Sequence, residues 1–389
     1  MNNQPILLVL GMFPWDYSHL SDTIRSMVKS MKHSRLIYIN PLAEDRAFTT
    51  KWQSKRKENI EIWNPPFSFL PTRYGIHRLR EKFSAHSLEQ QVVKELGADW
   101  RQKTIMYVTP TTLEQSYEYV SALNPEKLIL DILDDNLNFP SISEEKKIKL
   151  TEMLRSISEQ ATTVTAVSQY LVDQTKQLLH REDIHYLPNG VDVKMFKTIE
   201  DGELADIEAI PHPRVTFVGA ITTWIDLPLI ERVANMLADT QFILIGPIDP
   251  AIEDDSKIRK LKSMENVHFL GAKPYNQVPQ YLHASDVLLL PRTMDPYSLA
   301  CDPLKLYEYL ATGKPVVSTN HPSINRFLDF VYTGKTDEEI ALGIREALTR
   351  GKESIDLQQS VINSLSWETR MNQLMDLVNK NERKTVSLK

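Results

Sequence analysis

Lys305 and Glu308 stand three residues apart in a segment whose sequence predicts a short helix. Asp302 is the predicted N-cap, Pro303 fits the first helical position and Gly313 supplies a left-handed stop. The spacing places both charges on one face near the helix N-terminus, where the dipole and backbone N–H groups attract an anion. A lysine for phosphate and a carboxylate for ribose hydroxyls would together hold a nucleoside diphosphate. The alternative is a surface helix with an ordinary charged pair.

Three carboxylates, Asp131, Asp134 and Asp135, follow an apolar run that predicts a strand. Carboxylates in one cleft repel one another, which raises the proton affinity of at least one of them. Such a group suits a general base that removes a proton from an attacking hydroxyl. The alternative interpretation is a solvated turn, although the two apolar residues inside the cluster indicate that part of it is buried.

The composition is that of a globular protein with two domains. The 389 residues exceed what one hydrophobic core usually serves, and 42% of them are apolar and 25% charged. The formal net charge of −6 argues against a nucleic-acid partner. No apolar run approaches the roughly 20 residues of a membrane span, and the first residues lack the basic region of a signal peptide. We therefore expect a cytoplasmic protein.

Metal and nicotinamide chemistry are not expected. Cys301 is the single cysteine, which excludes an internal disulfide and a cysteine-cluster zinc site. The ten histidines form no His-Glu-x-x-His pattern, and no Asp-x-Asp pair stands where a diphosphate would bind. Gly11 follows the first predicted strand alone, without a Gly-x-Gly-x-x-Gly fingerprint. The sequence therefore predicts no metal and no cofactor.

Short apolar runs alternate with longer amphipathic stretches, which is typical of an α/β protein with parallel sheets covered by helices. An acidic stretch at 200–213 separates two such series, and we interpret it as the linker region. We predict domains at 1–190, to which a last helix at 366–389 returns, and at 191–365. The predicted strands are 5–11, 35–39, 104–108, 127–130 and 161–167 in the first series and 215–219, 241–246, 267–271, 287–291 and 315–318 in the second, with helices at 20–31, at 148–158 and from Ser168.

In this order, the segments resemble glycosyltransferases of the GT-B fold. The resemblance implies two Rossmann-like domains that face each other across a cleft, with a nucleotide-sugar bound mainly to the C-terminal one. Each matching segment is a weak signal alone, but the ordered set is strong. The segments are Leu187–Asp192, Val218–Gly219, Ile245–Pro247, Asn266–Gly271, Ala284–Pro291 and the helix from Pro303.

The resemblance also implies donor-binding residues. Glu308 occupies the second position of a Glu-x7-Glu motif, whereas the first falls at Ala300 and is missing. Most relatives carry an Arg and a Lys after the first strand of the second domain, but residues 220–226 contain no cation. The diphosphate would therefore rely on Lys305, the helix N-terminus and Arg292. The full set of expected donor-binding residues is Lys305, Glu308, Arg292, Tyr297, Leu304, Gly219 and Thr222.

These departures fit a smaller set of bacterial transferases that build exopolysaccharide or cell-wall glycans, among which a xanthan-type membrane-associated glucuronosyltransferase is similar in layout. The resemblance places Asp134 at the position of the general base, with Asp131 and Asp135 as alternative counterparts. It also places an acceptor-binding loop after the first strand, at Met12, Trp15 and Asp16. Trp15 is equally consistent with a core position.

Residues 51–82 mix basic with aromatic side chains, which suits peripheral contact with an anionic membrane. The alternative is a charged hairpin at the edge of the first sheet. The expected function is transfer of a sugar from a nucleotide diphosphate, most simply a UDP-sugar, to a glycan or polyprenyl-linked acceptor in bacterial polysaccharide biosynthesis. The rival hypotheses are a sugar-nucleotide 2-epimerase and a degenerate relative that serves as partner of another transferase.

Overall fold

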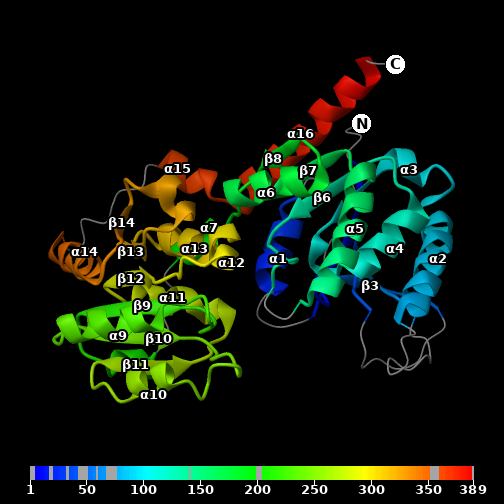
Figure 1. The fold of residues 1–389 in the computed structure, drawn as a ribbon. Coiled ribbons are helices and arrows are strands. Elements are labelled where there is room, and N and C mark those ends of the chain that lie inside the picture. Colours follow the sequence, from blue (N-terminus) through cyan, green and yellow to red (C-terminus); the bar gives the residue numbers. More distant parts are fainter. Residues whose placement is uncertain are drawn as a thin grey trace. The chain divides into compact units, whose positions relative to one another are not determined.

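The computed structural model describes residues 5–16, 21–31, 35–42, 51–57, 60–66, 77–139, 142–198, 204–350 and 359–387. The chain forms two compact units (Figure 1). Unit 1 comprises Met1–Pro188 and Met371–Lys389, and unit 2 comprises Asn189–Arg370. The divisions thus lie near residues 188 and 370, compared with the predicted 190 and 365.

The described part of unit 1 holds a sheet in the order β3-β4-β2-β1-β5-β6-β7-β8. Its pairs are parallel except β3 with β4, which are antiparallel. β3 consists of exposed polar residues and forms the edge, so the basic segment at 51–57 is one strand of a hairpin. The strands are β1 (Ile6–Leu10), β2 (Arg35–Ile39), β3 (Gln53–Lys57), β4 (Ile60–Asn64), β5 (Thr104–Val108), β6 (Leu128–Ile132), β7 (Thr163–Ala166) and β8 (Ile184–Tyr186).

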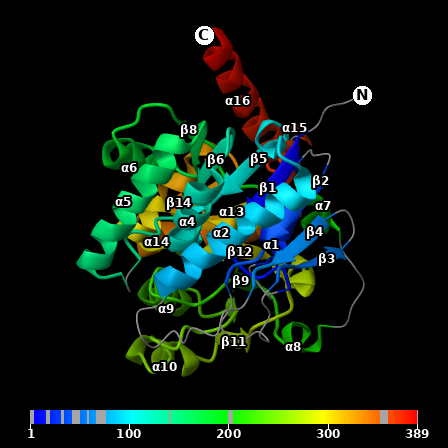
Figure 2. The same ribbon diagram turned by 90° about the vertical axis from the view of Figure 1, so that its right-hand side faces the viewer.

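The helices of unit 1 lie on both faces of its sheet, because connections between parallel strands are right-handed. Figure 2 shows the strands of this sheet from β3 and β4 at the right to β8 at the left. The chain moves one way across the sheet from β1 to β2 and the other way from β5 to β8, so right-handed crossovers place α1 on the opposite face from α4, α5 and α6. Ser143 and Ser168 cap α5 and α6 by accepting hydrogen bonds from Lys146 and Leu171. The helices are α1 (Ser21–Lys29), α2 (His77–Leu96), α3 (Trp100–Lys103), η2 (Pro110–Thr112), α4 (Leu113–Leu123), α5 (Glu144–Gln160) and α6 (Gln169–Leu179).

Unit 2 holds an all-parallel sheet in the order β11-β10-β9-β12-β13-β14. All five strands predicted for this half are present, and β14 is an addition. The strands are β9 (Arg214–Val218), β10 (Gln241–Ile245), β11 (Val267–Gly271), β12 (Val287–Leu290), β13 (Val316–Thr319) and β14 (Val331–Gly334).

Two hydrophobic clusters cover the two faces of this sheet, one including residues of α11 and α13 and the other residues of α9, α10 and α14. Leu204, Ile207 and Ile210 belong to the first cluster, so the prediction of a linker at 200–213 is wrong for its described part. The helices are α7 (Val193–Lys197), α8 (Ala205–Glu208), α9 (Leu227–Met236), α10 (Ser256–Lys262), η3 (Tyr275–Gln277), α11 (Val278–His283), α12 (Pro296–Ala300), α13 (Leu304–Thr312), η4 (Pro322–Phe327), α14 (Asp337–Arg350) and α15 (Gln359–Ser364).

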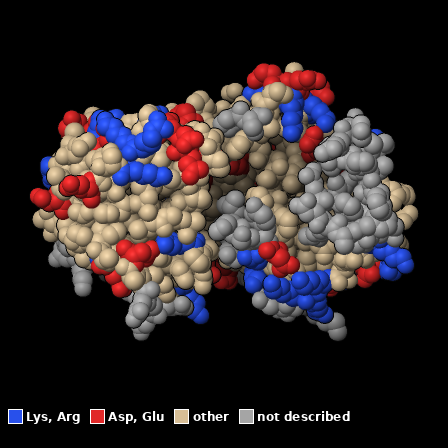
Figure 3. Space-filling model, turned by 90° about the horizontal axis from the view of Figure 1, so that it is seen from below, with Lys and Arg blue, Asp and Glu red and all other residues tan. Residues whose placement is uncertain are grey.

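The last helix, α16 (Trp367–Ser387), begins in unit 2 and continues in unit 1. Within unit 1, Leu374 and Val378 are buried, and Asn381 Nδ2 donates to Thr162 O over 3.0 Å. None of the described helices is long and apolar enough to span a bilayer. On the face drawn in Figure 3, basic side chains gather in small groups beside acidic ones.

Candidate functional site

The predicted nucleotide helix is α13, and its start differs from the expectation. Pro303 is the N-cap, the helix begins at Leu304, and no side chain caps it. Asp302 instead accepts hydrogen bonds at one carboxylate oxygen from Asn189 N and Tyr307 OH, both over 2.7 Å. The predicted N-cap is therefore wrong, because Asn189 N and the Tyr307 hydroxyl occupy the carboxylate oxygen in place of the first N–H groups of the helix. The first N–H groups of α13 are left without a side-chain cap, as an anion site requires.

Lys305 and Glu308 lie together on α13, as their spacing predicts. Lys305 Nζ lies 3.0 Å from Glu308 Oε2, and Tyr275 OH donates to Glu308 Oε1 over 3.0 Å. Glu308 is buried, whereas the Lys305 side chain keeps 28% of its exposure. These contacts fix the position of the Lys305–Glu308 ion pair. Because each carboxylate oxygen has a second lone pair, Glu308 can still accept a hydrogen bond from a ligand hydroxyl.

Gly219 at the end of β9 brings backbone next to Lys305. A Cβ added at Gly219 would lie 3.4 Å from Lys305 Cε. A Cβ added at Gly246, which directly follows β10, would lie 1.9 Å from Gly219 O. The carboxyl ends of β9 and β10 therefore approach each other as bare backbone beside the lysine. Close approach of this kind is what a strand end needs to admit a phosphate-bearing ligand.

Arg292 and Thr222 come from the two loops that follow β12 and β9. The loops pair through a bridge between Ile225 and Arg292, and the rings of Trp224 and Tyr297 lie 5.3 Å apart. Arg292 Nη2 and Thr222 Oγ1 are both buried, and neither has a hydrogen-bond partner in the described part of the chain. An unsatisfied buried polar atom costs about 1–3 kcal/mol, and a ligand oxygen that bonded either atom would remove that cost.

His321 contacts the segment that holds the Arg292 side chain. Its Nε2 lies 2.7 Å from Ser298 O and its Nδ1 2.7 Å from Ser323 Oγ. Burial lowers the pKa of His321 to about 4, and the nearby Arg292 charge adds to the shift. The imidazole is therefore neutral at physiological pH. Ser298 Oγ in turn accepts from Arg292 Nε over 3.1 Å, so His321 fixes the segment that orients the guanidinium.

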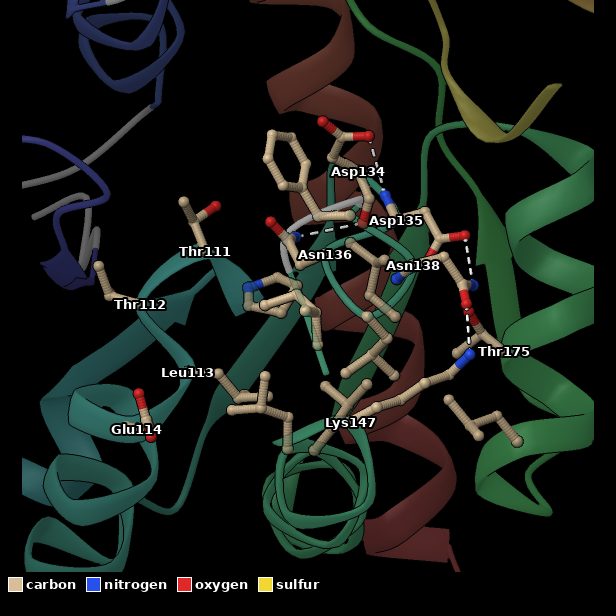
Figure 4. A pocket seen from close by; sticks show the side chains of 18 of the residues that line it. Thr111, Thr112, Leu113, Glu114, Asp134, Asp135, Asn136, Asn138, Lys147 and Thr175 are labelled. Atoms are coloured by element: carbon tan, nitrogen blue, oxygen red, sulfur yellow. Dashed lines mark hydrogen bonds between the residues drawn. The ribbon is translucent and has the colours of Figure 1, made fainter. Parts of the chain in front are cut away.

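Unit 1 contains a pocket of about 820 Å³ at the carboxyl end of its sheet. Figure 4 shows Thr111, Thr112 and Glu114 on one side of this pocket and Thr175 of α6 on the other. Leucine and isoleucine side chains form part of its lining, while Asp134, Asn136 and Asn138 contribute polar groups. An amphipathic lining of this size accommodates a ligand that has both hydroxyl groups and apolar surface.

The three clustered carboxylates do not share this pocket. Asp131 is fully buried in the sheet, where it accepts hydrogen bonds from Tyr107 OH over 2.6 Å and Thr165 Oγ1 over 2.7 Å. The expectation of three mutually repelling carboxylates is therefore wrong, because the backbone alternation of β6 turns Asp131 inward. Asp134 and Asp135 both line the pocket.

Asp135 stabilises the loop that follows β6 by accepting hydrogen bonds within it. Its two oxygens hold Asn138, which accepts a hydrogen bond from Lys147 Nζ. Asp134 is only half-buried, and its Oδ1 accepts from Asp135 N over 2.9 Å. Of the three carboxylates, Asp134 is the most exposed to solvent.

The predicted acceptor residues after β1, Met12, Trp15 and Asp16, are not among the residues that line the pocket. Trp15 is 3% exposed, packs edge-on against Tyr38 at 4.9 Å and donates its backbone N–H to Asn40 Oδ1. The core interpretation of Trp15 therefore holds. Met12 is also buried, while Asp16 is exposed and lies 3.4 Å from the ammonium groups of Lys55 and Lys57.

Sequence reasoning missed several residues that complete these sites. Tyr275, Ser298 and His321 reach Glu308 and Arg292 from distant segments, and no local period marks them. Asn138 and Lys147 were equally unmarked, although their position just beyond the carboxylate cluster was a usable signal. Among the described residues, no group of three or more His, Cys, Asp or Glu side chains is placed to hold a metal ion.

Comparison with known proteins agrees with this architecture. Residues 212–350 match the family model described as Glycosyl transferases group 1. The putative teichuronic acid biosynthesis glycosyltransferase TuaH of Bacillus subtilis (strain 168) is 31% identical over 192 residues. That match covers 49% of this chain and 47% of the relative, so the chain matches about half the length of this curated relative.

Solved structures share the fold over nearly the whole chain. Sucrose-phosphate synthase from Thermosynechococcus elongatus is 14% identical, with a TM-score of 0.70 over 99% of this chain and 100% of that one. HepE of Anabaena in complex with UDP and glucose is 17% identical, with a TM-score of 0.61 over 99% of both chains. The protein therefore has the GT-B fold. Within it, segment 212–350 is similar to group 1 glycosyltransferase domains.

Proposed function

We propose that the protein is a glycosyltransferase that moves a sugar from a UDP-sugar to a glycan or lipid-linked acceptor in bacterial cell-envelope polysaccharide biosynthesis. The observation that carries the proposal is the Lys305–Glu308 pair beside the uncapped start of α13. This arrangement lies in the segment matched by the glycosyltransferase family model. The name of the teichuronic acid relative supports the assignment to polysaccharide biosynthesis, and the UDP bound to HepE supports UDP as the nucleotide of the donor.

In the proposed donor complex, Glu308 accepts the ribose hydroxyls and Lys305 neutralises the diphosphate. The unpaired Arg292 Nη2 and Thr222 Oγ1 receive the remaining donor oxygens, which removes the cost of leaving them unsatisfied. Arg292 thus supplies the cation that residues 220–226 lack, from the neighbouring loop to which they are bridged. With these charges in place the proposal requires no metal, and chelation with EDTA should leave turnover unchanged.

The pocket of unit 1 is the proposed acceptor site. Asp134 takes the proton from the acceptor hydroxyl as it attacks the anomeric carbon, and the nucleoside diphosphate leaves with the electron pair of the glycosidic bond. The half-buried position of Asp134 beside Asn136 supports this role. The fixed loop formed by Asp135, Asn138 and Lys147 holds the base in position.

The proposal also includes peripheral contact of residues 51–82 with an anionic membrane, which would present a lipid-linked acceptor. β3 is fully exposed and carries Lys55, Arg56 and Lys57, while Asp16 offsets part of that charge. The aromatic residues at 67–76 lie outside the described residues. Cosedimentation with anionic vesicles at low salt tests the contact, and protein that stays in the supernatant excludes it.

The donor site is tested by thermal shift against UDP, GDP, ADP, CMP and dTDP. A nucleotide present at about 100 times its Kd should add about 2.7 kcal/mol of stability. We expect UDP alone to stabilise the protein and Glu308→Ala to abolish the effect. Glu231→Ala is the matched control, because Glu231 also pairs with a lysine, Lys260 at 2.7 Å, but on the opposite side of the sheet.

Turnover assays separate transfer from the rival functions. UDP release that requires an added acceptor supports a transferase. Conversion of the UDP-sugar without acceptor points to an epimerase. UDP binding without turnover in any acceptor mixture points to a degenerate partner, and absence of nucleotide binding contradicts the proposal.

A further inference from the structure

The segment Leu187–Asp192, which the sequence singles out, enters unit 2 directly beside the donor helix. The chain passes between the units at Pro188–Asn189 and again at Arg370–Met371. These two crossings are joined inside unit 2, because Val191 N donates to Leu365 O over 2.8 Å and Trp367 N donates to Val191 O over 3.2 Å. Both passages therefore belong to one connected piece of backbone.

Asp302 connects that piece to α13. Asn189 donates its backbone N–H to Asp302 Oδ2 over 2.7 Å and its side-chain amide to Asp302 O over 2.9 Å. Tyr307, one turn into α13, donates its hydroxyl to the same Oδ2 over 2.7 Å. Tyr307 immediately precedes Glu308, so this contact fixes the rotation of the helix face that presents the donor-binding pair.

Charged groups from two further elements face the carboxylate. Arg326 of η4 and Arg370 at the second crossing both act on Asp302 electrostatically, and Arg326 Nη1 also lies 3.3 Å from Tyr307 OH. Burial raises the pKa of Asp302 to about 6, against the lowering effects of Asn189, Tyr307 and the two arginines. The positive charges of Arg326 and Arg370 compensate the negative charge of the ionised Asp302 carboxylate. The carboxylate therefore need not repel a diphosphate that binds near the start of α13.

We propose that Asp302 is a positioning residue for donor binding, whose ionised carboxylate ties the junction of the two units to the α13 face that carries Lys305 and Glu308. The inference rests on the proposed function, since the ligand is the nucleoside diphosphate of that donor. An ionised oxygen makes stronger hydrogen bonds to Asn189 and Tyr307 than a neutral acid or amide does. Protonation or neutralisation of Asp302 therefore weakens the two hydrogen bonds that orient the start of α13, even though it removes a buried charge from unit 2.

The test is the Kd of UDP, measured by calorimetry between pH 5 and pH 8 for the full-length protein and Asp302→Asn. The asparagine keeps an acceptor oxygen but not the charge. We expect Asp302→Asn to bind UDP about tenfold more weakly at pH 7.5, the difference between a charged and a neutral acceptor. Near pH 5 the two proteins should agree within about twofold, because Asp302 is then largely protonated. The terminal phosphate of UDP also titrates near pH 6, and this changes both Kd values equally. The ratio of the two Kd values is therefore independent of that titration.

Tyr307→Phe provides a second variant that keeps Asp302 itself. It removes one hydrogen bond to the carboxylate, so the pH at which UDP affinity declines should move upward. Tyr281→Phe is the matched control, because Tyr281 also donates to an aspartate of unit 2, Asp206 over 3.0 Å, and its loss should leave the pH profile unchanged.

Three outcomes would overturn the positioning role. They are a Kd ratio that is constant with pH, tighter binding of UDP by Asp302→Asn at pH 7.5, and an unshifted profile for Tyr307→Phe. In each case wild-type protein still binds UDP, so the proposed function survives. A wild-type protein that binds no UDP at any pH would instead contradict both proposals at once.

Discussion

The substitution Asp302→Asn should stabilise unit 2 at neutral pH, although the same change weakens donor binding. Asp302 is buried, and burial raises its pKa from 3.8 to about 6. A shift of about two pKa units corresponds to about 3 kcal/mol. Because the folded-state value is raised, the stabilising contribution of this group is present below about pH 4 and is lost as the pH rises through about 6. At pH 7.5 the wild-type protein therefore bears a buried charge that the asparagine lacks.

The magnitude in an accessible pH range follows from the same two pKa values. Between pH 4.5 and pH 7.5, the free energy of unfolding of Asp302→Asn should rise by about 2 kcal/mol relative to wild type. Because a chain of two domains need not unfold in one step, the measurement should report on unit 2 alone. Hydrogen exchange of the buried amides of β12, compared between variant and wild type at each pH, provides that free energy.

A control of opposite sign comes from Asp206. Burial raises its pKa, but hydrogen bonds from Lys273 and Tyr281 outweigh that effect and lower it overall. Asp206→Asn should therefore lose stability relative to wild type as the pH rises, where Asp302→Asn gains it. If Asp302→Asn were less stable than wild type at pH 7.5, or if its advantage did not change with pH, the burial argument for Asp302 would be refuted.

Three further predictions concern single residues. Asp134→Asn should lower the transfer rate by about 10² to 10⁴ and leave the Kd of UDP unchanged, and an unaltered rate would exclude Asp134 as the base. Gly246→Ala should unfold at a lower temperature than Gly271→Ala. The added Cβ at 246 would lie 1.9 Å from Gly219 O, whereas the Cβ at 271 has nothing within 4 Å and costs only about 1–2 kcal/mol of backbone strain. Equal melting temperatures of the two variants would contradict this prediction. His321 should remain neutral at pH 5, since burial lowers its pKa to about 4, and nitrogen NMR shifts of a protonated ring at pH 5 would disprove it.

Local sequence patterns were sufficient for most of the fold. The apolar runs of the two series form buried parallel strands, and Gly313, at a φ of 72°, ends α13 where its sequence predicts. The strand β3 was covered only by the alternative interpretation of 51–82 as a charged edge hairpin, because its sequence Gln-Ser-Lys-Arg-Lys has no apolar alternation and it is a strand only through pairing with β4. The linker prediction failed because the acidic composition of the stretch outweighed the spacing of Leu204, Ile207 and Ile210, which recur every third residue as on one helix face.

For the candidate sites, the sequence by itself determined which residues stand on one helix or loop: Lys305 beside Glu308, and Asp134 at the end of a strand. Their spacing follows from the helical and strand periods, which are local properties of the backbone. Only the tertiary structure decided which charges face a ligand and which are held by protein. Asp131 is held by Tyr107 and Thr165, and Asp302 by Asn189 from 113 residues away. Such partners are chosen by the packing of distant segments, and no local period records them.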